Sequence, residues 1–274
     1  QRQILMSSHG LAGRVLTLTG RMSMFRARLA CDPDFIDHVQ NDYIDHWRLG
    51  RIRMLTGDDK SSWFWLLKNG YNMYYVPDVQ VETIEQPPSP SFIGSAYVLM
   101  TRWFGNMLRT NSRALRLGPM KIGAFTWWSV LDQRMSMWTS LSGITLALLG
   151  TAMVTPWTAV FYILWVIVSR YILALTFLTV RPSINLVYIP LLYFNQIFGS
   201  AVKVMIFFRL DRQKWTRQKT AFKRTDSRFD AAFKLWSSRL VNTVAVLVFV
   251  SLLVILANLG SSFPEETPES LPKI

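Results

Sequence analysis

The chain has 274 residues, 50% of them hydrophobic, and a formal net charge of +13. Its single cysteine, Cys31, excludes an intrachain disulfide and any cysteine-rich metal site. A basic excess can indicate nucleic-acid binding, but here it has a better explanation, because the apolar residues gather in long runs from Met137 onward. The sequence therefore favours a membrane protein without a nucleic-acid partner. It begins at Gln1 without a signal-peptide pattern, so we expect part of a longer protein.

Residues 1–91 are predicted to form part of a soluble α/β domain. These elements are too few for a complete nucleotide-binding sheet, so we expect the beginning of the domain to lie outside the chain. The expected strands are Val15–Thr19, Arg21–Ala27, Asn72–Val76 and Val79–Ile84, with turn and helix in Asp32–His46 and a helix at Lys60–Asn69 that Gly70 ends.

Residues 92–136, which follow a proline-rich stretch, are predicted to be interfacial helices. In Phe92–Leu117 the apolar side chains share one helical face, and a row of arginines forms another. A basic amphipathic helix suits the membrane interface, where its cations meet anionic lipid. The alternative is a helix packed on the soluble domain with a solvated arginine face. The arginines are Arg102, Arg109, Arg113 and Arg116.

Residues 137–260 are predicted to be a transmembrane region. A hydrocarbon core of roughly 30 Å needs about 20 helical residues. Several apolar runs meet or approach this length, and their number in so short a stretch disfavours a buried helical core. The runs are Trp138–Val154, which is slightly short, Trp157–Thr179, Ile184–Phe208 and Val241–Leu259.

Charge predicts the sidedness of these runs. Basic residues prevail in 102–121 and in the loop 209–240, so both are expected in the cytoplasm, whereas the tail 261–274 is acidic. A full crossing by Ile184–Phe208 would place the basic loop outside. Because Pro190 and a polar pair interrupt that run, we expect a re-entrant or interfacial helix pair there, and a last span that carries the tail to the periplasm.

Residues 56–60 read Thr-Gly-Asp-Asp-Lys, a pair of carboxylates at a helix start with an ammonium beside them. Glycosyl transfer to a sugar hydroxyl needs a general base near the acceptor and cations against the leaving pyrophosphate. Asp59 is the candidate base. The alternative is helix capping, because Asp is favoured at the N-cap and in the first turn.

The order of the motifs resembles that of processive family-2 glycosyltransferases, the group of cellulose, hyaluronan and chitin synthases. Asp58, Asp59 and Lys60 resemble the family's Asp-Asp-Arg or Glu-Asp motif, and Arg102-Trp103 resembles the end of its Gln-x-x-Arg-Trp motif. The sequence departs from the family at Leu99, where the family has Gln.

A closer resemblance is to the catalytic subunits of bacterial alginate polymerases, the mannuronan synthases. It implies the C-terminal part of a GT-A-type α/β glycosyltransferase domain, followed by interfacial helices and an α-helical transmembrane bundle. It also implies transfer of mannuronate from GDP-mannuronic acid to a growing β-1,4-linked polymannuronate, which the protein exports. The runs that carry it are Leu18–Arg26, His46–Arg51, Thr56–Phe64, Arg102-Trp103, Asn111–Leu115, Leu131–Arg134 and Phe208–Gln218.

The resemblance also implies residue roles. Asp59 is the general base with Asp58 beside it, and Lys60 takes the place of the family's Arg. Trp103 stacks on the acceptor and Arg102 lies near the pyrophosphate, while further substrate contacts come from Gly20 and Arg21. A gating loop is implied at Trp215, Thr216 and Arg217, for which a solvated basic loop is the alternative.

The same resemblance implies a cofactor, partners and a location. A divalent metal, Mg²⁺ or Mn²⁺, would be bound mainly by an Asp-x-Asp element outside this chain, and no metal site is expected within it. Membrane lipid and a PilZ-domain, cyclic-di-GMP-binding co-polymerase are expected partners in the bacterial inner membrane, with the catalytic domain in the cytoplasm. Two other functions remain open, a synthase that uses a UDP-sugar and a non-catalytic transport subunit.

Two cations lie within the apolar runs, where unpaired charges are costly. A uronic acid polymer brings one carboxylate per sugar, so Arg170 is predicted to line the translocation path. The alternative for Arg170 is a buried partner. Lys203 is expected to extend to the membrane interface, because it lies near the end of its run.

Overall fold

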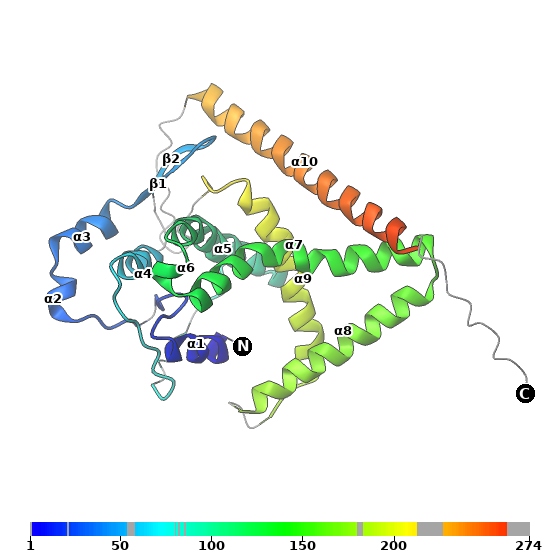
Figure 1. Cartoon of the computed structure of the whole chain (residues 1–274), viewed down its shortest axis with the longest axis horizontal. Helices are drawn as coiled ribbons and strands as arrows, with labels where there is room; N and C mark the ends of the chain where they lie inside the picture. Colours follow the sequence, from blue (N-terminus) through cyan, green and yellow to red (C-terminus); the bar gives the residue numbers. More distant parts are fainter. Residues whose placement is uncertain are drawn as a thin grey trace, which may run out of the picture.

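The computed structural model describes residues 2–20, 22–53, 58–79, 81, 83–84, 86–179, 183–212 and 227–261, and these residues are mostly helical (Figure 1). The elements are α1 (Arg2–Leu11), α2 (Ala27–Ala30), α3 (Pro33–Gln40), β1 (Tyr43–His46), β2 (Gly50–Arg53), α4 (Asp58–Lys68), α5 (Phe92–Arg116), α6 (Pro119–Ile122), α7 (Ala124–Met153), α8 (Trp157–Leu175), the 3-10 turn Thr176–Thr179, α9 (Tyr188–Phe207) and α10 (Arg228–Ser261).

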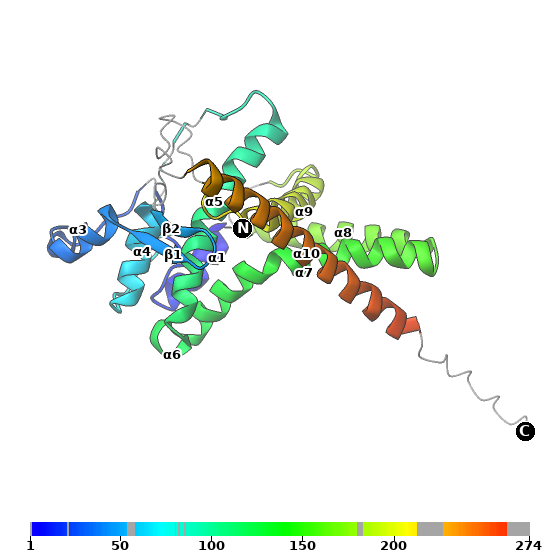
Figure 2. The same ribbon diagram turned by 90° about the horizontal axis from the view of Figure 1, so that it is seen from above.

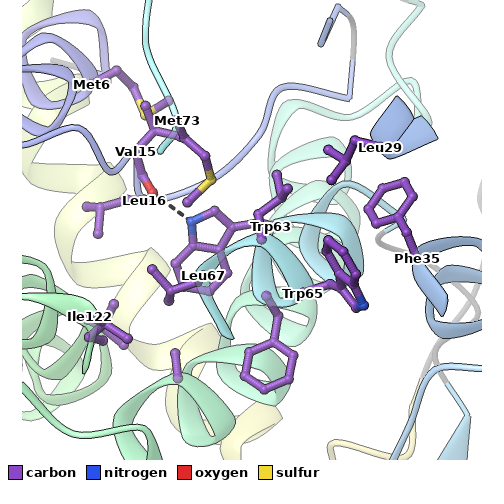
Figure 3. Close-up of a cluster of buried hydrophobic side chains, with 14 residues drawn as sticks. Met6, Val15, Leu16, Leu29, Phe35, Trp63, Trp65, Leu67, Met73 and Ile122 are labelled. Carbon is purple, nitrogen blue, oxygen red and sulfur yellow. Dashed lines mark hydrogen bonds between the residues drawn. The ribbon is translucent and has the colours of Figure 1, made fainter. Parts of the chain in front are cut away.

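Helix α4 is the centre of the soluble segment. Its side chains from Lys60 to Leu67 are all buried, and Trp63 and Leu67 are fully enclosed. Figure 3 shows them among apolar side chains from well-separated parts of the chain, including Met6, Met73 and Ile122. The predicted helix at Lys60–Asn69 is confirmed, and Gly70 follows its end with a φ of 75° that favours glycine. The core therefore holds α4 on nearly every side.

The predicted strands are wrong for the described residues. The sheet there is the antiparallel hairpin β1–β2, in a stretch where turn and helix were expected for its first half. Around Val15 the backbone is irregular because side chains of α4 take its carbonyl groups. Trp63 Nε1 donates to the Val15 carbonyl at 2.6 Å (Figure 3), and Lys60 Nζ donates to the Leu16 carbonyl at 3.1 Å. These bonds replace those that a neighbouring strand would supply.

The Asp42 carboxylate joins three elements of this segment. It lies between α3 and β1, and its side chain is only 2% exposed. Both terminal nitrogens of the Arg113 guanidinium on α5 donate to it. The Ser61 hydroxyl of α4 also donates to it, at 2.5 Å. A carboxylate removed from water requires such partners. The hairpin, α4 and α5 are thereby fixed to one another.

Helix α5 is confirmed as an amphipathic helix, but neither interpretation of its whole arginine row holds. Arg113 is paired with Asp42, and Arg109 is 1% exposed and donates to the Leu210 carbonyl at 2.9 Å and to Asn106 Oδ1. Burial lowers the pKa of Arg109 to about 9. Arg109 and Arg113 are enclosed because α5 packs on α4, α7 and α9, whereas Arg116 at the end of α5 is exposed.

Three described helices are long and apolar enough to cross a membrane, which identifies this as a membrane protein. They comprise residues Trp157–Leu178, Tyr188–Phe207 and Arg228–Asn258. The run Trp138–Val154 is not among these candidates by length and composition, and it forms the second half of the single helix α7.

The predicted helix pair in Ile184–Phe208 is wrong, because α9 is one continuous helix. Pro190 lies in its first turn, where the missing N–H has no helical partner to lose. Figure 1 shows α9 running crosswise to α7, against which it packs. Figures 1 and 2 both show α8 and α10 extending away from the soluble elements.

Replacement of Asp42 by Asn should destabilise the protein strongly. It leaves the Arg113 guanidinium without its counter-charge in a largely buried site, which costs about 3–5 kcal/mol in comparable pairs. The matched control is Asp45→Asn, which removes the exposed Asp45–Arg51 pair on the same hairpin and should leave stability unchanged. Thermal unfolding of the detergent-purified protein measures both, and equal effects would contradict the role of Asp42.

The charge pattern predicts the sidedness of the last candidate span. A reporter that is active only in the periplasm should be active when fused after Asn258, at the end of that span. The same reporter fused after Asp211, beyond the end of α9, should be silent because the basic loop is retained inside. Activity after Asp211 would place the basic loop outside and contradict this sidedness.

Candidate functional site

The first turn of α4 presents the predicted pair of carboxylates. Asp58 is exposed and Asp59 is partly buried, while Thr56 and Gly57 lie outside the described residues. Oδ1 of Asp59 accepts the backbone N–H of Lys60 at 2.9 Å. The partial positive charge at a helix N-terminus favours an ionised carboxylate at this place. Because the core fixes α4, this carboxylate has a defined position.

Gly20 lies directly against the Asp59 carboxylate. A Cβ atom built on Gly20 would lie 3.7 Å from Asp59 Oδ2, which is ordinary van der Waals contact. A longer side chain at this position would occupy the space in front of the carboxylate. The structure thus brings together two of the predicted site residues that are far apart in sequence, while Arg21 lies outside the described residues.

Lys60 differs from its two neighbours because its side chain enters the core. The residue is 8% exposed, and Nζ lies 4.9 Å from the centre of the Trp63 ring as well as bonding to the Leu16 carbonyl. In this arrangement the ammonium holds the segment that leads to Gly20. Motif spacing alone could not reveal this inward direction of the Lys60 side chain.

The second predicted motif lies on α5. Trp103 is 52% exposed, so its ring is accessible to a ligand, and Arg102 beside it is partly buried. The next residue, Phe104, packs near Gly199 of α9. The proposed gating residues Trp215, Thr216 and Arg217 lie outside the described residues.

The described residues do not fit a metal site. Within that part of the chain, no three His, Cys, Asp or Glu side chains gather closely enough to hold a metal ion.

A polar cavity of about 360 Å³ lies among α5, α7, α8 and α9. Arg170 of α8 borders it and donates to Gln196 of α9, which supports the predicted alternative of a buried partner. Lys203 borders the same cavity, donates to Ser136 Oγ at 3.0 Å and lies 4.8 Å from the centre of the Phe104 ring. The expected extension of Lys203 to the interface is therefore wrong, because this ammonium turns inward.

The sequence of α9 contains a pattern of polar residues that indicates this cavity, although the single charge of Lys203 does not. Gln196, Ser200 and Lys203 recur at the spacing of one helical face, and all three line the cavity. A polar face within an apolar helix indicates that it faces protein or water rather than lipid.

The sequence of this chain is similar to those of known glycosyltransferases. The family Glycosyltransferase like family 2 matches residues 1–106. Two curated relatives are both named Glycosyltransferase alg8. The protein of Azotobacter vinelandii is 48% identical over 255 residues, which are 93% of this chain and 52% of the relative. The protein of Pseudomonas syringae pv. tomato (strain ATCC BAA-871 / DC3000) is 48% identical over 254 residues, again 93% and 52%.

The chain spans about half the length of the curated relatives it matches. No solved structure matches it. The family match over the soluble segment and the candidate spans agree with the predicted C-terminal part of a GT-A-type domain joined to a helical bundle. The soluble segment thus matches the family-2 glycosyltransferases, and 93% of the chain is similar to curated proteins named Glycosyltransferase alg8.

Proposed function

We propose that the protein containing this chain polymerises mannuronate from GDP-mannuronic acid into β-1,4-linked polymannuronate and exports it across the bacterial inner membrane. The observation that carries the proposal is the Asp59 carboxylate in the first turn of α4, with Gly20 against it. That arrangement places a candidate base at a fixed position beside a residue that has no side chain. The chain's 48% identity to alginate glycosyltransferases supports the choice of sugar.

In the proposed reaction, Asp59 takes the proton from the acceptor hydroxyl as its oxygen attacks the anomeric carbon of the donor sugar. The bond to GDP breaks on the opposite face, so the configuration inverts. Trp103 holds the acceptor sugar by stacking, and Arg102 lies near the diphosphate. A divalent metal, Mg²⁺ or Mn²⁺, would neutralise the diphosphate charge, and we expect residues outside this chain to hold it.

The cavity that Arg170 and Lys203 border is the proposed place where the polymer passes the helices. A cation there would lower the electrostatic barrier to each carboxylate, provided that it binds too weakly to retain the chain. Gln196 orients Arg170 without neutralising its charge. A PilZ-domain co-polymerase that binds cyclic-di-GMP is the proposed partner, and it rests on family resemblance alone.

Replacement of Asp59 by Asn should abolish polymer formation, while the protein still accumulates in the membrane. The amide keeps the shape and can cap a helix but cannot accept the proton. The matched control is Asp34→Asn, since Asp34 is an exposed carboxylate in the first turn of α3. Incorporation of labelled sugar by isolated membranes measures both variants.

The control separates chemistry from helix stabilisation. Asp34→Asn should retain near-normal synthesis, because it alters only a helix-terminal charge. Near-normal synthesis by the Asp59→Asn protein would remove Asp59 from the mechanism. Equal losses in both variants would attribute the effect to helix stability.

Replacement of Arg170 by Gln should slow polymer export and leave the KM for the nucleotide sugar unchanged. The charge is lost from the cavity, whose lining includes none of Asp59, Arg102 and Trp103, so donor binding should be unaffected. Arg170→Lys is the control, because it preserves the charge and should export at close to the normal rate. Normal polymer yield from a stably inserted Arg170→Gln protein would contradict a role in export.

A further inference from the structure

A second and larger pocket lies beside the β1–β2 hairpin, and its lining includes neither Asp59 nor Gly20. Its volume is about 880 Å³, and its walls come from α3, the hairpin, α5, α7, the end of α9 and the start of α10. The walls are rich in guanidinium groups. The arginines are Arg48, Arg113, Arg116 and Arg134.

The carboxylates in these walls already have partners. Asp42 is paired with Arg113, and Asp45 is paired with Arg51 outside the pocket. The Asp37 carboxylate accepts the amide of Asn41 at 2.8 Å. Among the described residues, no ion pair joins any of these carboxylates to Arg48, Arg116 or Arg134.

Those remaining arginines bond only to neutral groups in the part of the chain that the structure describes. Arg48 donates to the Phe208 carbonyl at 2.7 Å and to the hydroxyls of Ser237 and Ser238. Arg134 donates to the Leu108 carbonyl at 3.2 Å. The exposed Arg116 has no bonded carboxylate among the described residues. The pocket therefore carries an excess of positive charge.

Arg116 and Arg134 are close enough to repel one another. Burial lowers the pKa of Arg134, and the neighbouring Arg116 lowers it further. An anion bound between two such guanidinium groups would reduce their mutual repulsion. Phosphate fits best, because the planar fork of Arg donates two parallel hydrogen bonds to phosphate oxygens.

The surroundings of the pocket indicate the source of the phosphate. Val241 of α10 forms part of the wall, and the neighbouring apolar side chains of α10 are exposed, with Leu240 at 65%. Trp236, also 65% exposed, lies at the start of the same helix, where aromatic rings mark a membrane interface. Acyl chains can therefore follow α10 from a headgroup held in the pocket.

We propose that this pocket binds the phosphate of an anionic phospholipid headgroup through Arg116 and Arg134. Arg113 borders the pocket and bonds to Asp42, which accepts from Ser61 of α4. The hydrogen bonds from Arg113 through Asp42 to Ser61 thus connect the wall of this pocket to the helix that carries Asp59. The proposal requires no particular donor sugar, so it stands or falls separately from the proposed function.

The test uses the full-length protein in nanodiscs, with fluorescent phosphatidylglycerol in a phosphatidylcholine background. The variant is Arg116→Gln with Arg134→Gln, and the matched control is Arg51→Gln, which removes a hairpin arginine outside the pocket. The double variant should bind phosphatidylglycerol about tenfold more weakly, because each basic residue near an anionic headgroup contributes to affinity. The control should bind like the unchanged protein.

A second variant, Arg116→Lys with Arg134→Lys, guards against loss of folding because it retains both charges. It should bind more tightly than the Gln variant and more weakly than the unchanged protein, since Lys lacks the bidentate fork. Unchanged phosphatidylglycerol binding by the Gln variant would overturn the proposal. Displacement of the lipid by millimolar inorganic phosphate would also overturn it, in favour of a soluble anion.

Discussion

The buried carboxylate of Asp42 is the constraint on which the arrangement of the soluble segment depends. A charge almost completely removed from water is tolerated only with good partners, and these come from Arg113 of α5 and Ser61 of α4. The pairing therefore fixes the position of α4 relative to α5. One carries the candidate base Asp59, and the other carries Trp103.

The same hydrogen-bonded framework continues into the apolar helices. Arg109 of α5 bonds to the Leu210 carbonyl just after α9, and Arg48 of the hairpin bonds to the Phe208 carbonyl and to the hydroxyls of α10. Backbone carbonyls at a helix end have no helical partner, so arginines are well suited to satisfy them. The candidate catalytic helix and the candidate spans are thereby parts of one connected structure.

The sequence predicted the features that local pattern controls, and missed those that depend on distant partners. Helices α4 and α5 follow from periodicity and from the stop at Gly70, and the closeness of Gly20 to Asp59 agrees with their assignment to one site. The strand predicted at Val15 failed because Trp63 and Lys60 take the carbonyl groups there. No local signal distinguishes an inward lysine from a solvated one. Lys203 is different, because the polar face that it shares with Gln196 and Ser200 is a local signal for its inward direction.

The proposed polymerisation of an acidic sugar is tested most directly by finding which nucleotide sugar the protein accepts as donor. Purified full-length protein in nanodiscs would be supplied in parallel with labelled GDP-mannuronic acid, UDP-glucose and UDP-N-acetylglucosamine, and polymer would be measured by size. We predict that long polymer forms from GDP-mannuronic acid alone and is degraded by an alginate lyase. Polymer formed from either UDP-sugar, with none from GDP-mannuronic acid, would contradict the account.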